Sequence, residues 1–133
     1  AQPPAPAAPW AWIAGAALGA AIHLVNVLPD LDDDARTGVR GLPHILGARV
    51  STLLAIGGLF VGAVATLLGP VGADAAAIPP LGWIFFGAAL ALTAATVVVA
   101  LSRPRARLLF SLVMAAALLL AVQLVATGGA LAA

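Results

Sequence analysis

The feature that most constrains this chain is the recurrence of long apolar stretches that contain no charged residue. A helix needs about 20 consecutive apolar residues to cross the hydrocarbon core of a bilayer. Four stretches approach or meet this length, and they span residues 10–28, 50–68, 81–101 and 108–127. Because they are rich in alanine and lack a polar alternation with a period of two, we expect helices rather than strands. The sequence therefore predicts an all-α membrane protein with four transmembrane helices.

The overall composition excludes a water-soluble domain. Of the 133 residues, 63% are hydrophobic and only 8% are charged. A soluble domain of this size exposes a large area to water, and so few charged residues could not make that area polar. The chain has no cysteine, which excludes disulfides and thiolate metal sites. We expect membrane lipid around the helices and no nucleic-acid partner.

The segments that connect the predicted spans carry nearly all of the charge. They are a Pro/Ala-rich extramembrane lead (1–9), an aspartate-rich loop (29–49), an outer loop (69–80), a basic loop (102–107) and a C-terminal tail (128–133). All six basic residues are arginines, and they occur only in the loops 29–49 and 102–107. Two spans separate these loops, so they share one membrane face, which the positive-inside rule makes cytoplasmic. Both termini and the loop with Asp74 would then lie on the outer side of the cytoplasmic membrane.

Several residues within or beside the spans have two interpretations. Gly15 and Gly19, like Gly58 and Gly62, have the GxxxG spacing that lets helices approach closely, although a chain rich in alanine and glycine also produces it by chance. An intramembrane histidine such as His23 is a functional candidate, or it hydrogen-bonds a neighbouring helix. Gln123 in the last span is better explained by an interhelical hydrogen bond than by contact with substrate.

Four carboxylates occur within five positions of the loop 29–49. In a helix, Asp30, Asp33 and Asp34 would share one face through i,i+3 and i,i+4 spacing, whereas Asp32 would point away from it. Like charges this close repel one another unless a cation neutralises them. Carboxylate oxygens are the ligands that Mg²⁺ prefers, and Mg²⁺ fills the rest of its shell with water and phosphate oxygens. The cluster therefore predicts a magnesium site.

Two arginines follow the acidic cluster at helical spacing. Arg36 and Arg40 are four residues apart, and guanidinium groups bind phosphate oxygens through two parallel hydrogen bonds. Glycines 38, 41 and 47 would let the backbone turn and approach a ligand. Acids followed by arginines at a membrane boundary suit a diphosphate bridged by a metal ion.

An alternative interpretation needs no ligand. An aspartate that follows a proline at a helix start often caps that helix, and arginines in a cytoplasmic loop often only fix topology. Capping accounts for one or two acids but not for four.

The run DLDDDARTGVRGLPHILG, residues 30–47, resembles the second aspartate-rich motif of the UbiA superfamily of intramembrane prenyltransferases. The resemblance covers about 18 contiguous residues, and the rest of the chain agrees with the family in hydropathy and topology. The motif positions are filled here by Asp30, Asp34, Arg36, Gly38, Arg40, Leu46 and Gly47.

The resemblance implies a fold and an activity. The family fold is a bundle of nine transmembrane helices, in which the second motif joins helices six and seven on the cytoplasmic side, so the four spans here would correspond to helices six to nine. The implied enzyme transfers a (poly)prenyl group from prenyl diphosphate to an acceptor, commonly an aromatic ring, and uses Mg²⁺. The implied roles are metal binding and catalysis for Asp30 and Asp34, metal binding for Asp33, and substrate binding for Arg36, Arg40 and Asn26.

The family's first motif, an N-D-x-x-D sequence between helices two and three, does not occur in this sequence. We therefore expect the chain to be the C-terminal part of such an enzyme, completed by an N-terminal half and inactive by itself. His44 stands where many relatives have a threonine or an aliphatic residue, which leaves the acceptor open. The alternative function is a non-enzymatic four-helix membrane protein, such as an assembly partner, with a capped acidic loop.

Overall fold

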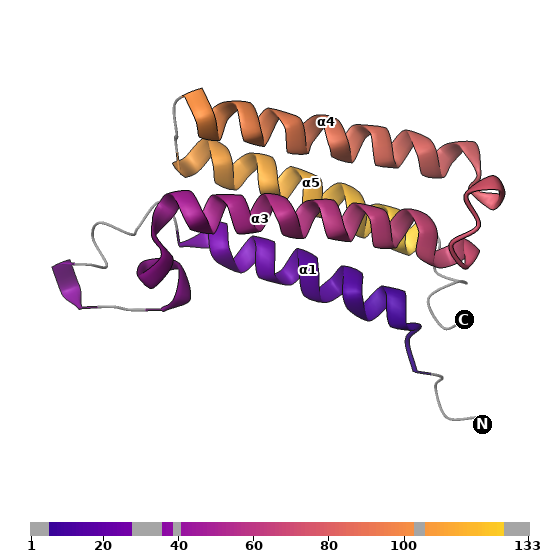
Figure 1. The fold of residues 1–133 in the computed structure, drawn as a ribbon, viewed down its shortest axis with the longest axis horizontal. Helices are drawn as coiled ribbons and strands as arrows, with labels where there is room; N and C mark the ends of the chain where they lie inside the picture. The colour runs from indigo at the N-terminus through magenta and orange to yellow at the C-terminus, as the bar shows by residue number, and fades with distance from the viewer. Residues whose placement is uncertain (1–5, 28–35, 39–40, 103–105, 127–133) are drawn as a thin grey trace.

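The computed structural model describes residues 6–27, 36–38, 41–102 and 106–126. Within these ranges all regular structure is helical, as predicted. The elements are α1 (Pro9–Asn26), α3 (Leu42–Leu68), the short 3-10 helices η2 (Gly69–Val71) and η3 (Ala75–Ala77), α4 (Pro80–Ser102) and α5 (Ala106–Ala126) (Figure 1).

The long helices lie side by side and form a bundle. α1 packs most extensively against α3, α4 packs against α5, and α5 also contacts both α1 and α3. The core lies between α1, α3 and α5, where Val25, Leu59, Val113 and Leu120 are almost completely buried. As Figure 1 shows, α1 and α4 end, and α3 and α5 begin, at one end of the bundle, whereas η2 and η3 lie at the opposite end. We call the first the motif end and the second the η end.

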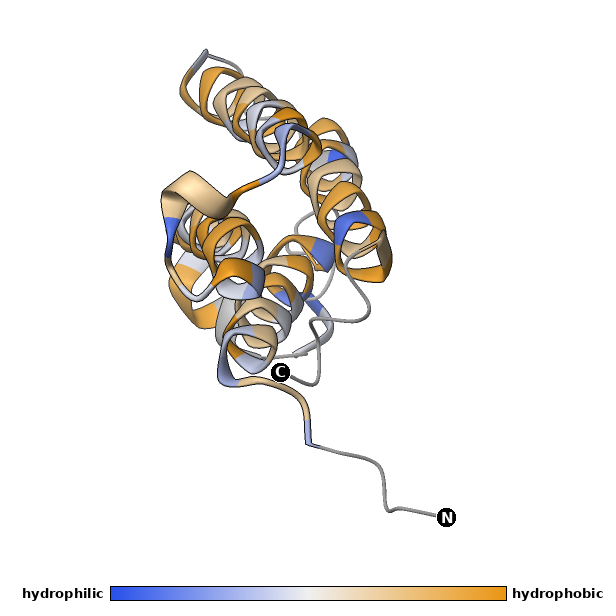
Figure 2. Ribbon diagram, turned by 90° about the vertical axis from the view of Figure 1, so that its right-hand side faces the viewer, coloured by the Kyte–Doolittle hydropathy of each residue, from blue (hydrophilic) through white to orange (hydrophobic). Residues whose placement is uncertain are grey.

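Three helical segments are long and apolar enough to cross a membrane: Ile45–Val71, Pro80–Ser102 and Arg107–Ala126. Large apolar side chains remain exposed on them, including Ile84 at 67%, Leu101 at 73% and Val125 at 80%. Figure 2 shows hydrophobic residues on the outward sides of the helices as well as between them. Such outward faces are favourable in contact with lipid and costly in water. For these three helices the sequence prediction of apolar, membrane-length helices is confirmed.

α1 differs from the other three long helices. It has 18 residues, which gives a length of about 27 Å, slightly less than the hydrocarbon thickness of a bilayer. Its last turn contains the polar residues His23 and Asn26, and both are exposed. α1 is not among the apolar membrane-length segments, because the polar residues of its last turn lower its mean hydropathy, so the fourth predicted span stays a prediction.

Glycines allow α1 and α3 to approach closely. A Cβ atom added to Gly58 would lie 2.7 Å from the backbone oxygen of Ala17, and one added to Gly62 would lie 2.8 Å from Cδ2 of Leu18. The predicted close approach at the Gly58–Gly62 pair is therefore confirmed. At Gly15 and Gly19 an added Cβ would meet nothing within 4 Å, because that face of α1 is open in this chain.

We expect Gly58→Ala to lower the free energy of unfolding by about 1–3 kcal/mol relative to Gly57→Ala. The new methyl group at residue 58 would overlap a backbone oxygen, which cannot rotate away, so the two helices must separate. A Cβ added to Gly57 would meet nothing within 4 Å. Both changes gain the same helix propensity, so their difference isolates the overlap. Unfolding of the two variants in detergent is the measurement, and equal stabilities would contradict the predicted close packing.

A glycine interrupts α3 near its start. Gly47 has φ 80° and ψ 169°, a conformation that only glycine adopts readily. The preceding turn, Leu42–Leu46, begins where the N–H of Ile45 donates to the carbonyl oxygen of Gly41 at 3.2 Å. The long part of α3 then starts at Ala48. The sequence predicts that residues 29–49 form a loop, but helical structure already begins within them, at Leu42. The turn Leu42–Leu46 ends at Gly47, whose backbone conformation is not helical.

Candidate functional site

The predicted diphosphate site maps to the motif end of the bundle. Asn26 ends α1, the segment 36–38 follows, and α3 begins at Leu42 (Figure 1). Asp30, Asp33, Asp34 and Arg40 lie outside the described residues, so their roles stay predictions. Asn26 and Arg36 are the two predicted site residues that the structure describes, and both are exposed.

Asn26 is held in place by the buried residues that precede it. Leu24 is 6% exposed and Val25 is completely buried against the core. The last turn of α1 is therefore anchored, and the asparagine that follows lies at the surface of the motif end. His23 lies one turn before Asn26 and is also exposed. Side chains three residues apart on a helix are neighbours, so these two polar groups share one face of α1.

Both glycines of the motif that the structure describes have a positive φ angle. Gly38 has φ 78° and Gly47 has φ 80°, in the region that glycine adopts without steric cost. The sequence analysis predicts backbone turns at these positions, and the structure confirms the turns. The predicted turn at Gly41 stays a prediction, because the preceding residue lies outside the described part.

The described charges are separated between the two ends of the bundle. Arg36, Arg49 and Arg107 are exposed in the segments that lie at the motif end. Asp74, the one acid among the described residues, precedes η3 at the η end, where its Oδ1 accepts a hydrogen bond from the N–H of Ala76 at 3.1 Å. Among the described residues, the charged side chains of the motif end are therefore arginines, while the four aspartates of the acidic run lie outside the described part.

Two buried hydroxyl groups follow the break at Gly47. Ser51 is completely buried and Thr52 is 3% exposed, and the Thr52 hydroxyl donates to the carbonyl oxygen of Ala48 at 2.7 Å. This bond occupies the carbonyl of the first residue after the break, so it supports the start of the long helical segment. The sequence analysis did not single out these residues. In the sequence, the feature that could have indicated them is that two adjacent hydroxyl residues occur at the start of a mostly apolar span.

The described residues contain no group of three or more histidine, aspartate or glutamate side chains that could hold a metal ion. The aspartates on which the magnesium prediction depends are not among those residues. His44 lies in the first turn of α3, but its side chain is also outside the described part.

A scan against protein-family models found no match for this chain, and searches of curated proteins and of solved structures found no similar protein. The resemblance to the prenyltransferases therefore stays a prediction that depends on the residues of the motif.

Proposed function

We propose that this chain is the C-terminal part of a Mg²⁺-dependent intramembrane prenyltransferase of the UbiA type. The enzyme transfers a (poly)prenyl group from prenyl diphosphate to a lipophilic, commonly aromatic, acceptor. The observation that carries the proposal is the run of acids, arginines and glycines between residues 30 and 47, which joins two helices at one end of an apolar bundle. The positive φ angles at Gly38 and Gly47, two glycine positions of the motif, support it independently of composition.

The side chains of the motif suit the chemistry of a departing diphosphate. Asp30, Asp33 and Asp34 offer the hard oxygen ligands that suit Mg²⁺, and the bound ion neutralises the charge that develops on the leaving group. Arg36 and Arg40 bind phosphate oxygens through paired hydrogen bonds. Asn26, exposed at the end of α1, lines the entrance to the site. The surrounding apolar helices exclude water, which would otherwise capture the activated prenyl group.

The open face of α1 supports the presence of a further half of the bundle. Five exposed residues follow one another at intervals of four, three, four and three: Trp12, Ala16, Gly19, His23 and Asn26. This spacing places them along one side of the helix, opposite the buried residues. Polar side chains facing lipid are costly, and small residues let another helix approach. The N-terminal half of the enzyme is the partner that we propose for this face.

The motif end is cytoplasmic in this proposal. The chain has no native cysteine, so single cysteines at Ala48, Ser102 and Ala75 each provide one thiol, and all three positions are exposed. In intact cells we expect a membrane-impermeant maleimide to label Ala75→Cys and to leave Ala48→Cys and Ser102→Cys unmodified. All three should react after the cells are permeabilised. Labelling of Ala48→Cys in intact cells would overturn the orientation.

We expect the 133-residue chain by itself to show no prenyl transfer, because its sequence has one acidic motif where the proposed site needs two. Purified chain is incubated with Mg²⁺, geranyl diphosphate or a longer prenyl diphosphate, and a panel of aromatic acceptors. Coexpression with an N-terminal half that contains an N-D-x-x-D loop should give turnover. Turnover by the chain alone that Asp30→Ala abolishes would show the first motif to be dispensable. Inactive but stable assemblies with several such halves would favour the non-enzymatic alternative.

A further inference from the structure

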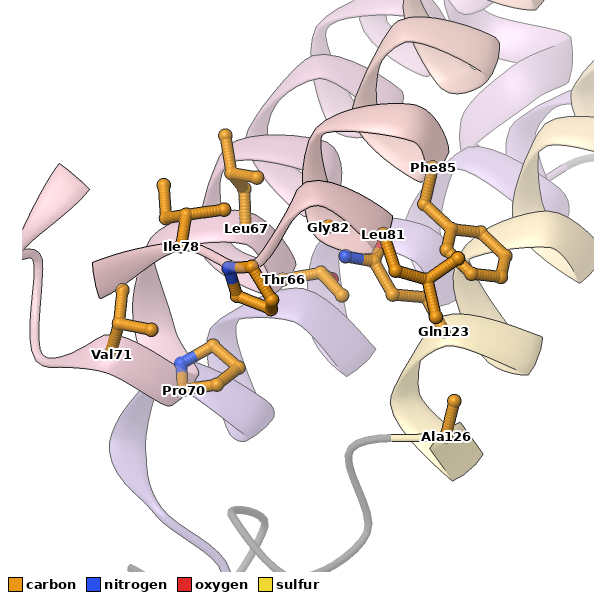
Figure 3. A pocket seen from close by; sticks show the side chains of 11 residues that line it. Thr66, Leu67, Pro70, Val71, Ile78, Leu81, Gly82, Phe85, Gln123 and Ala126 are labelled. Atoms are coloured by element: carbon orange, nitrogen blue, oxygen red, sulfur yellow. The ribbon is translucent and has the colours of Figure 1, made fainter. Parts of the chain in front are cut away.

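A pocket of about 450 Å³ lies at the η end of the bundle, between the last turns of α3, the start of α4 and the end of α5 (Figure 3). Thr66 and Leu67 of α3, Phe85 of α4 and Gln123 of α5 lie around it, together with residues of the η2–η3 connection. From Ala48, where the long part of α3 begins, to Thr66 the helix rises about 27 Å. The pocket is therefore separate from the predicted diphosphate site by nearly the length of the bundle.

The pocket wall is apolar except at two buried side chains. Thr66 is 1% exposed and Gln123 is 3% exposed, and both line the pocket. The Thr66 hydroxyl donates to the carbonyl oxygen of Gly62 at 2.7 Å, and its oxygen can still accept a further bond. A glutamine amide carries two donor hydrogens and an acceptor oxygen with two lone pairs. Gln123 can therefore hydrogen-bond a protein group and a ligand at the same time.

The size and chemistry of the pocket define the class of molecule that fits it. Its volume falls within the range of small-molecule sites, which are mostly apolar with a few polar groups that orient the ligand. None of the described residues that line it is charged, so a charged ligand would lose its hydration without compensation from them. Phe85 offers an aromatic ring for edge or face contacts with a planar ligand.

We propose that this pocket binds an uncharged, lipid-soluble molecule with a ring-shaped apolar body and one hydroxyl or carbonyl group. The apolar body occupies the space beside Leu67 and Phe85, and the polar group hydrogen-bonds the Gln123 amide. The site is independent of prenyl transfer, since it lies at the opposite end of the bundle from the acidic run.

The test uses a single cysteine at the edge of the pocket as a reporter of occupancy. Ala126 lines the pocket and is exposed, so Ala126→Cys in the cysteine-free chain gives one thiol whose rate of maleimide labelling a bound ligand lowers. The probes are 1-naphthol and naphthalene, which differ by one hydroxyl group. We expect 1-naphthol to protect the thiol at lower concentration than naphthalene. Ala75→Cys, at an exposed residue of η3 that does not line the pocket, controls for general effects of the probes on the detergent micelle.

The Gln123→Leu substitution removes the proposed hydrogen bond to the ligand and keeps an apolar side chain at that position of the pocket wall. Loss of one hydrogen bond should raise the 1-naphthol concentration needed for half-protection about fivefold and leave naphthalene unchanged. Phe85 is half-buried, and Phe85→Leu should weaken protection by both probes. If Gln123→Leu does not fold, the Phe85→Leu variant tests whether the probes bind in this pocket. Equal protection by the two probes, no effect of either substitution, or equal slowing at Ala75→Cys would each overturn the proposal.

Discussion

Replacing Asp34 by asparagine in the assembled enzyme is expected to lower the turnover of prenyl transfer by at least about 100-fold. In the proposed site, asparagine would keep the size of the side chain but remove the charge with which Asp34 would hold Mg²⁺. The ion acts mainly on the negative charge that develops as diphosphate departs, so the loss appears in the transition state more than in substrate binding. Asp30→Asn should have an effect of the same order, because both residues are assigned the same role.

The neighbouring acid provides a matched control. Asp32 lies within the same run but off the face that Asp30 and Asp34 would share, so Asp32→Asn should retain most of the turnover. If the acids only cap a helix, asparagine is nearly as good a cap as aspartate, and all three substitutions should be mild. The measurements are turnover at saturating Mg²⁺ and thermal stability in detergent for each variant. Near-normal turnover of Asp30→Asn would contradict the assignment of this segment as a diphosphate site.

Much of the fold can be predicted from hydropathy, because residues that face lipid in a transmembrane helix must be apolar. Long charge-free runs predict the helices, and the described arginines Arg36, Arg49 and Arg107 lie at the opposite end of the bundle from Asp74, as the sequence predicts. α1 is the exception, since the polar residues His23 and Asn26 in its last turn lower the mean hydropathy of the helix. In the proposed function a further helix covers this face, and the requirement for an apolar surface is relaxed there.

Features that depend on contacts between segments were not readable in the same way. The sequence shows two GxxxG pairs of equal appearance, yet a Cβ added to Gly58 or Gly62 would collide with α1, while one added to Gly15 or Gly19 would meet nothing within 4 Å. Which pair is used depends on how the helices are rotated about their axes, and in evenly apolar helices the hydropathy pattern does not fix that rotation. The pocket beside Gln123 arises for the same reason, because it exists only where three helices and a connection meet. For the acidic run, the spacing of Asp30, Asp33 and Asp34 predicts that they share one face only if this segment forms a helix.

Gly47→Ala is expected to reduce prenyl transfer in the assembled enzyme more than it reduces overall stability. At φ 80° and ψ 169° a side chain costs about 1–3 kcal/mol, so the variant can relieve the strain by continuing the helix through residue 47. That change would remove the break and redirect the turn Leu42–Leu46, from which the chain leads back to Arg40 and the acidic run. Gly58 and Gly62, which lie against Ala17 and Leu18 of α1, are well beyond the break, so the bundle itself should persist.

Gly57→Ala in the same helix is the control for this prediction. Gly57 lies within the regular part of α3, and an added Cβ there would meet nothing within 4 Å, so the change should be neutral or stabilise the helix by up to about 1 kcal/mol. Unfolding in detergent and turnover are measured for both variants. If Gly47→Ala matched Gly57→Ala in turnover, the break would have no part in shaping the site. A loss of turnover with a nearly unchanged unfolding midpoint would show that a backbone conformation available only to glycine positions the diphosphate-binding segment.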